Sequence, residues 1–236
     1  MFSAATKSGA VTTKTDPQFD YVSLLLNGDG TNGAQNNTFL DSSSNAFTIT
    51  RNGNTTQGSF SPYGSLWSNY FGSGNYLTTA TNTAFTFGSG DFTVECWFNM
   101  VATSANQTLF TVGDASGTID EIRIYFDGSN KILYSLYAGG SYLVSPVTTT
   151  YAPSLGSWNH ISMVRSGGTV TIYFNGTSIS SSSISGSFSN TDKLAIGTLL
   201  ALTTTRNFNG YISNFRVVKG TAVYTSNFTP STTPLT

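Results

Sequence analysis

The chain has 236 residues, a length at which an all-β sandwich commonly forms one domain whose core needs no disulfide or metal. Charged residues make up only 9% of it, the net charge is −1, and the ten Lys and Arg residues are scattered, which argues against nucleic-acid binding. No apolar run approaches the roughly 18 residues of a membrane span, and residues 1–20 lack the apolar centre of a secretory signal peptide.

Residues 1–20 are predicted to form an extended N-terminal arm. They combine small and polar residues with Pro17 and show no hydrophobic period. Such a segment either frays or becomes ordered against a neighbouring subunit, and both alternatives stay open. We place the domain itself at residues 21–236.

From Tyr21 onward, short apolar or alternating runs are separated by turn residues, a pattern typical of β-strands. No segment keeps a helical period for three turns, and ten or more strands need two layers, so we predict an all-β, two-sheet antiparallel jelly-roll sandwich. One or two short helical turns are expected at its ends. The sequence SGG at 166–168 predicts a tight hairpin, because glycine supplies the positive φ angles of such turns. The predicted strands are 21–26, 46–51, 92–98, 108–113, 121–126, 131–137, 160–165, 169–174, 193–197 and 208–219.

Alternation divides the predicted strand 92–98 into two faces. One face carries Phe92, Val94, Cys96 and Phe98, and the other carries Thr93, Glu95 and Trp97. Cys96 is the only cysteine, so it can form no disulfide within the chain. We expect it to be an inert core thiol.

Three segments carry a family pattern in a fixed order: YFGSGNYLTTATNTAFTFGSGDFTVECWF at 70–98, WNHISMVRSGGTVTIYFNGTSI at 158–179 and FNGYISNFRVVKGTAVYTSNFTP at 208–230. Together they resemble laminin G-like domains of the concanavalin A-like type. The resemblance implies two curved sheets packed face to face, with a concave face or rim loops that bind glycans in many relatives. The ending VVKGTAVYTSNFTPSTTPL is similar to the ending of domains in virion proteins of marine bacteriophages.

The distribution of acids argues against an enzyme. Folds of this type also host glycosidases, which need two carboxyl groups about 5 Å apart when the mechanism is retaining. Glu95 and Glu121 are the only glutamates, and the adjacent Asp120 and Glu121 would point to opposite sides of a strand. His160 is the sole histidine and lies within a predicted strand, so we expect a structural role for it and no zinc site. We predict a non-enzymatic protein; convergence of distant acids such as Glu95 and Asp127 is left as the alternative.

A calcium ion is the one cofactor that the resemblance leaves open. Related domains hold the ion between an early Asp-Ser segment, here Asp41 in LDSSSN, and an acid at the position of Ser213 or Asn214. This chain lacks that second charge. Ca²⁺ also accepts carbonyl and amide oxygens, but fewer charges mean weaker binding.

A glycan site would combine an aromatic platform with polar groups. Trp97 projects from the otherwise polar face of its strand beside Glu95, either as a stacking platform or as a plug under a crossing loop, and the plug is favoured. Tyr137 and Tyr142 lie in a Gly- and Tyr-rich stretch whose loops could form a rim. These four residues are our candidate ligand-binding residues.

Composition suggests where such a protein acts. A neutral surface rich in Ser and Thr, one cysteine and no export signal are typical of a protein made in the host cytoplasm and released by lysis. Our first hypothesis is a phage virion structural protein, a capsid decoration or fibre component. It would form homo-oligomers, contact other virion proteins at the virion surface, and display a lectin-like domain toward host-surface glycans. A bacterial carbohydrate-binding module or surface adhesin is the alternative, and a glycan-cleaving enzyme is the third hypothesis.

Overall fold

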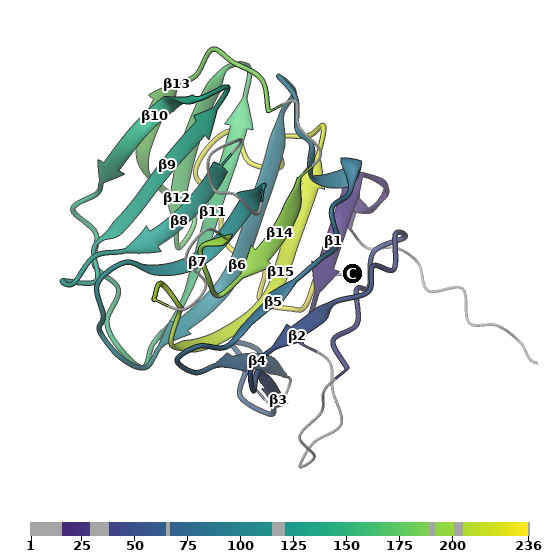
Figure 1. Cartoon of the computed structure of the whole chain (residues 1–236), viewed down its shortest axis with the longest axis vertical. Helices are drawn as coiled ribbons and strands as arrows, with labels where there is room; N and C mark the ends of the chain where they lie inside the picture. The colour runs from purple at the N-terminus through teal and green to yellow at the C-terminus, as the bar shows by residue number, and fades with distance from the viewer. Residues whose placement is uncertain are drawn as a thin grey trace, which may run out of the picture.

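Two antiparallel β-sheets packed face to face form the structure, a computed structural model that describes residues 16–28, 38–64, 67–114, 121–188, 192–200 and 205–235 (Figure 1). The predicted two-sheet jelly-roll sandwich is confirmed. The larger sheet contains β1 (Val22–Leu26), β3 (Thr56–Gly58), β4 (Ser68–Phe71), β6 (Phe92–Met100), β11 (Trp158–Ser166), β12 (Thr169–Phe174), β13 (Thr177–Ser183) and β15 (Gly210–Lys219). The smaller sheet contains β2 (Thr50–Asn52), β5 (Tyr76–Thr78), β7 (Gln107–Gly113), β8 (Glu121–Phe126), β9 (Ile132–Ala138), β10 (Ser141–Thr148) and β14 (Lys193–Ile196).

The strand order places β6 at the centre of the larger sheet. The order there is β13-β12-β11-β6-β15-β4-β3, with β1 also paired to β15, and in the smaller sheet it is β10-β9-β8-β7-β14-β5-β2. Both neighbours of β6 are long strands that come from distant parts of the sequence, β11 and β15. The outward side chains of β11, β6 and β15 therefore form the middle of the outer face of the larger sheet.

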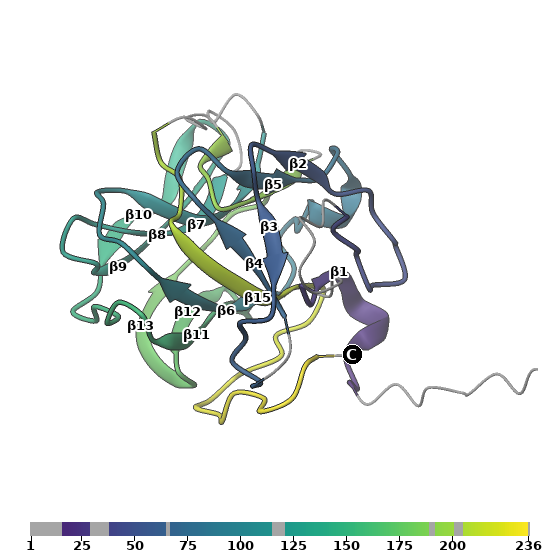
Figure 2. The same cartoon turned by 90° about the horizontal axis from the view of Figure 1, so that it is seen from below.

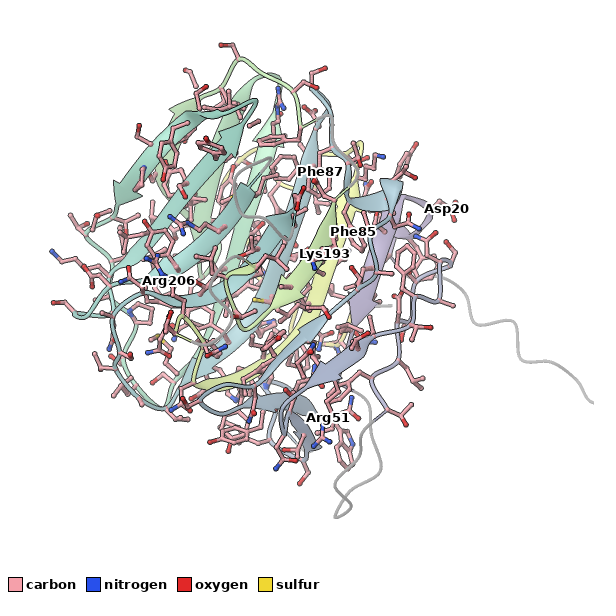
Figure 3. The ribbon with its side chains drawn as sticks, viewed as in Figure 1. Asp20, Arg51, Phe85, Phe87, Lys193 and Arg206 are labelled. Carbon is pink, nitrogen blue, oxygen red and sulfur yellow. The ribbon has the colours of Figure 1, made fainter. Side chains whose placement is uncertain are left out.

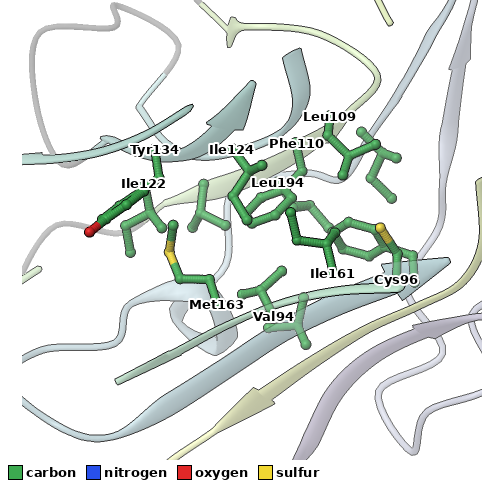
Figure 4. Close-up of a cluster of buried hydrophobic side chains, with 14 of the residues drawn as sticks. Val94, Cys96, Leu109, Phe110, Ile122, Ile124, Tyr134, Ile161, Met163 and Leu194 are labelled. Atoms are coloured by element: carbon green, nitrogen blue, oxygen red, sulfur yellow. The ribbon is translucent and has the colours of Figure 1, made fainter. Parts of the chain in front are cut away.

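The inward side chains of both sheets make one continuous core. Val94, Cys96, Ile161 and Met163 from the larger sheet meet Ile122, Ile124, Tyr134 and Leu194 from the smaller one (Figure 4). The predicted core face of strand 92–98 is thus confirmed, and Cys96 is a buried free thiol. Burial raises the pKa of that thiol well above its usual value, so it is inert at neutral pH.

Every predicted run contains a strand, and β8 and β12 have the predicted bounds. The run 46–51 was predicted too long: only β2 (Thr50–Asn52) forms there, and Thr48 makes an isolated bridge to Leu40. Five strands were not predicted: β3, β4, β5, β10 and β13. β3, β10 and β13 lie at sheet edges, where a strand can expose polar side chains on both faces and so loses the alternating signal.

The predicted hairpin at 166–168 is confirmed. Ser166 pairs with Thr169, and Gly167 and Gly168 have φ angles of 52° and 85°. Two positive φ angles at the central residues define the type I′ turn, whose twist matches that of the flanking strands.

Both terminal segments lie against the outer face of the larger sheet. Figure 2 shows the yellow C-terminal segment passing outside this sheet and ending beside the purple N-terminal segment, which includes the 3₁₀ helix η1 (Phe19–Tyr21). A second, small apolar cluster forms beneath them, from Val22, Leu25, Val218, Val223 and Leu235.

Residues 1–15 of the predicted arm lie outside the described residues. Residues 16–20, the remainder of that arm, pack against the domain. A second 3₁₀ helix, η2 (Thr83–Phe85), precedes β6.

Candidate functional site

Glu95 lies at the centre of a buried polar network on the outer face of the larger sheet, where it is only 1% exposed. Its Oε1 accepts a hydrogen bond from Arg216 Nε at 2.7 Å and also contacts Nη2 of the same guanidinium. Its Oε2 accepts a hydrogen bond from the Tyr224 hydroxyl at 2.9 Å and lies 3.0 Å from Nε2 of His160. The other end of Arg216 pairs with Asp16. The network therefore ties both terminal segments to the sheet.

Glu95 and Arg216 form a buried pair of opposite charges at neutral pH. Burial opposes ionisation of Glu95, but the Arg216 guanidinium and the contacts with His160 lower the pKa of the carboxyl from 4.5 to about 2. Burial likewise opposes the charge of Arg216, and the carboxylate keeps its pKa above the ordinary value. A carboxyl group held ionised and enclosed in this way can neither donate a proton near pH 7 nor reach a sugar ring.

Trp97 shares this face with Glu95, and it is half-buried. Its ring centroid lies 6.1 Å from that of Tyr63, on the loop between β3 and β4, and 5.3 Å from that of His160. Phe228, on the C-terminal segment, packs against the other side of His160 at 5.7 Å. Of the two roles considered for Trp97, this position corresponds to the plug under a crossing loop.

Tyr137 and Tyr142 lie on the opposite side of the sandwich. They face each other across β9 and β10, with ring centroids 5.2 Å apart, and Tyr142 is 50% exposed. Tyr134 and Leu136 of the same strand belong to the core, so Tyr137 points outward from the smaller sheet. The structure therefore brings together Glu95 with Trp97 and Tyr137 with Tyr142, but it does not bring the two pairs together.

The Asp41 carboxylate is engaged by hydrogen-bond donors. Oδ1 accepts from the backbone N–H groups of Leu25 and Ser43, both at 2.9 Å. Oδ2 accepts from the Ser43 hydroxyl at 2.8 Å and from the N–H of Phe47 at 2.9 Å. A cation bound to this carboxylate would have to displace those donors.

Ser213 and Asn214 are similarly engaged in β15. The Ser213 hydroxyl is within hydrogen-bonding distance of the carbonyls of Trp67, at 2.9 Å, and Asn27, at 3.3 Å. The Asn214 amide donates to Ser213 Oγ and accepts the N–H of Leu235 at 2.9 Å. Ser213 and Asn214 thus hold the segments around Asn27 and Leu235 to β15, and in this hydrogen-bonded arrangement neither they nor Asp41 fit a calcium ion. Within the described ranges, no three His, Cys, Asp or Glu side chains are grouped so that they could hold a metal.

A continuous aromatic patch, formed by Phe60, Tyr70, Trp158 and Tyr211, lies on the outer face at one end of the larger sheet. The ring centroids of Trp158 and Phe60 are 5.2 Å apart, those of Phe60 and Tyr211 are 4.7 Å apart, and those of Tyr211 and Tyr70 are 4.9 Å apart. Phe60 is 43% exposed and the other three are partly exposed. Three of the rings stand on β11, β15 and β4, which lie in one sheet with β6 between β11 and β15 (Figure 2). The patch is therefore a row of rings on rigid strands.

Two N–H donors lie unsatisfied beneath this patch. Asn99 of β6 is paired in register with both Trp158 and Tyr211, so its side chain lies between theirs. Asn99 is 1% exposed, and its Nδ2 and the Nε1 of Trp158 have no hydrogen-bond partner among the residues that the structure describes. Phe60 contacts both flanking rings, and Ser68 donates a hydrogen bond to its carbonyl. This site was not predicted from the sequence. The alternation of side chains that placed Trp97 on the outward face of its strand could also have been applied to Trp158 and Tyr211.

Two packed antiparallel sheets with this strand arrangement define a β-sandwich of the concanavalin A-like type. Residues 71–223 match the family described as the concanavalin A-like lectin/glucanases superfamily, and the chain belongs to this superfamily. Its fold is one that lectin and glycan-binding domains use. A search of curated proteins finds no match.

Solved structures with this fold include several binding domains. The binding domain of Paraclostridial Mosquitocidal Protein 1 aligns with a TM-score of 0.66 at 15% identity, over 88% of this chain and 50% of that one. Domain 4 of AbnA, an extracellular GH43 arabinanase from Geobacillus stearothermophilus solved with arabinotriose, aligns with a TM-score of 0.64 at 17% identity, over 86% and 94%. The binding domain of botulinum neurotoxin serotype D/C aligns with a TM-score of 0.61 at 16% identity, over 86% and 50%. The chain thus spans about half the length of the two toxin domains.

Proposed function

We propose that this protein is a non-catalytic glycan-binding module and that the strand-borne rings of the aromatic patch, Trp158, Tyr211 and Tyr70, form its binding platform. The observation that carries the proposal is the row of partly exposed rings on three strands of the larger sheet. The faces of sugar rings are apolar and their rims are hydroxyls, so they bind well to aromatic platforms that have polar groups beside them. The hydroxyls of Tyr70 and Tyr211 form no bond to the protein within the described residues, which leaves them to a ligand.

The absence of catalysis in this proposal rests on where the acids lie. Glu95, one of two glutamates in the chain, is enclosed by Arg216, His160 and Tyr224. Asp127 follows β8 in the smaller sheet, where it accepts backbone N–H groups of its own turn. The alternative pairing of Glu95 with Asp127 is therefore not supported, since the two belong to different sheets.

A glycan array with clustered protein tests the proposal, because multivalent display raises avidity. We expect binding by the wild type and a loss of at least about 30-fold on Trp158→Ala, the factor that corresponds to 2 kcal/mol for an anchoring aromatic residue. Trp97→Ala is the matched control, since it removes the same ring from the plug position and should leave glycan binding in place. Equal binding by wild type and Trp158→Ala would exclude the patch as the site.

We further propose that the module is displayed on a bacteriophage particle, as a homo-oligomeric capsid decoration or fibre component that contacts other virion proteins. The neutral composition, the single cysteine and the similarity of residues 217–235 to endings in marine phage proteins support this proposal. Mass spectrometry of purified virions tests it, and absence of the protein from the particles would contradict it. The alternative, a bacterial carbohydrate-binding module or adhesin, is favoured by the likeness to the AbnA domain.

No helix in the described part of the chain is both long enough and apolar enough to cross a membrane.

A further inference from the structure

We infer that Asn99 and Trp158 form a hydrogen-bonding subsite for a neutral sugar, and that Phe60 is its movable cover. The inference rests on the proposed function and specifies which atoms would recognise the ligand and which class of glycan they select. Its starting point is the pair of buried N–H donors beneath the patch, Nδ2 of Asn99 and Nε1 of Trp158.

The register of the sheet brings these donors together. Trp158 lies directly opposite Asn99 in β11 and β6, and Tyr211 lies opposite Asn99 on the other side, in β15. The rings of Trp158 and Tyr211 are 6.4 Å apart, so they flank the amide between them. A buried donor without a partner is costly, and folded proteins keep very few of them. Two such donors on residues paired in register beneath a partly exposed patch indicate a place where a ligand supplies the acceptors.

Phe60 is placed to open and close this subsite. Its ring bridges Trp158 and Tyr211 above the amide, at 5.2 Å and 4.7 Å, while its backbone carbonyl is held by the Ser68 hydroxyl. The backbone is thus anchored and the ring itself is 43% exposed. Rotation of this one side chain would uncover both donors without moving any strand. A sugar ring that takes its place would lie against both Trp158 and Tyr211, as Phe60 does, and accept both hydrogen bonds through its hydroxyl oxygens.

The surroundings of the subsite favour a neutral sugar. Glu95, an acid on the same face of the sheet, is buried and paired with Arg216. Arg51, on β2, donates to the Thr55 carbonyl at the turn before β3. Lys193 and Arg206, both labelled in Figure 3, contact the smaller sheet through their backbones: Lys193 is part of β14, and the Arg206 carbonyl accepts the N–H of Thr108 in β7. Hydroxyl oxygens suit the two N–H donors, and a neutral sugar brings no charge that needs a partner here.

Calorimetric titration with defined trisaccharides tests this inference. The probes are a panel of neutral trisaccharides that includes arabinotriose, and one sialylated and one sulfated trisaccharide. Three variants separate the roles. Trp158→Phe keeps a stacking ring but loses the N–H, Asn99→Leu replaces the amide by an apolar group of similar shape, and Phe60→Ala removes the cover.

We expect the wild type to bind a neutral trisaccharide, with an affinity that added salt does not change. Trp158→Phe and Asn99→Leu should each weaken binding by about tenfold, the usual scale for one lost hydrogen bond. Phe60→Ala should bind equally well or better. Asn99→Leu should also raise the thermal midpoint or leave it unchanged, because it removes an unsatisfied buried donor. A residue that only supported the fold would instead lower that midpoint.

Other outcomes would overturn the inference in recognisable ways. If Trp158→Ala abolishes binding but Trp158→Phe and Asn99→Leu bind like the wild type, the rings bind sugar and the donors do not. Loss of affinity in Phe60→Ala would make Phe60 part of the platform and not a cover. Preference for an acidic trisaccharide would leave the proposed function standing and refute the neutral class. Failure of the wild type to bind any glycan would refute the proposed function as well.

Discussion

Replacing Glu95 with glutamine should remove a large share of the stability of the fold. The side chain keeps its shape but loses its charge, which leaves Arg216, only 2% exposed, paired with Asp16 alone. Removing one partner of a buried ion pair costs about 3–5 kcal/mol. A pKa lowered from 4.5 to about 2 corresponds independently to about 3 kcal/mol. The two estimates agree, so we expect Glu95→Gln to lower the free energy of unfolding by about 3 kcal/mol.

The pH dependence of stability gives the same prediction a second readout. Because the folded-state pKa of Glu95 is depressed, its contribution is present above pH 4.5 and is lost as the pH falls from 4.5 to about 2. Urea unfolding of wild type and variant across this range should show curves that differ at pH 7 and converge toward pH 2. Asp127→Asn is the control, since Asp127 is a turn residue outside the network and the variant retains its Oδ1 acceptor. If Glu95→Gln unfolds at the same urea concentration as wild type at pH 7, the buried carboxylate does not contribute the expected free energy of folding.

Three further changes test other contacts of the fold. Gly176→Ala should destabilise the protein more than Gly74→Ala: both glycines have φ of 79°, but only at Gly176 would a Cβ meet a neighbour, the Phe228 carbonyl at 1.9 Å, so faster amide exchange should appear in the C-terminal segment of that variant alone. Tyr134→Phe removes hydroxyl bonds of 2.9 and 2.8 Å to two serines of β13 and should cost about 1–2 kcal/mol in urea unfolding. Cys96 should react with a thiol reagent only after denaturation, and labelling of the native protein would contradict its burial.

The central strands could be predicted from the sequence because burial imposes a strong pattern on them. In β6, apolar side chains alternate with others, since one face meets the core. β10 and β13 were missed for the opposite reason: each is a sheet edge, and each leaves polar residues exposed on both faces. β10 also contains Pro146, which lies at an irregularity of the ladder with β9.

The site could be predicted only in part, because sequence alternation assigns faces within a strand but does not say which strands are neighbours. Glu95 was placed on the outward face correctly, yet its burial depends on residues 221–235, which show no strand pattern. The aromatic patch draws its rings from four separate segments, so each ring looked isolated in the sequence. Tyr137 and Tyr142 were candidate ligand-binding residues together with Trp97 and Glu95, but they belong to the other sheet.

The indole N–H resonances of the three tryptophans offer the most direct test of the binding surface. Trp158 lies in the aromatic patch, while Trp97 lies under the loop that carries Tyr63. During NMR titration with a neutral trisaccharide that binds, the account predicts that the indole signal of Trp158 shifts most and that of Trp97 stays in place. A shift confined to Trp97, or binding that leaves the Trp158 signal unmoved, would contradict it.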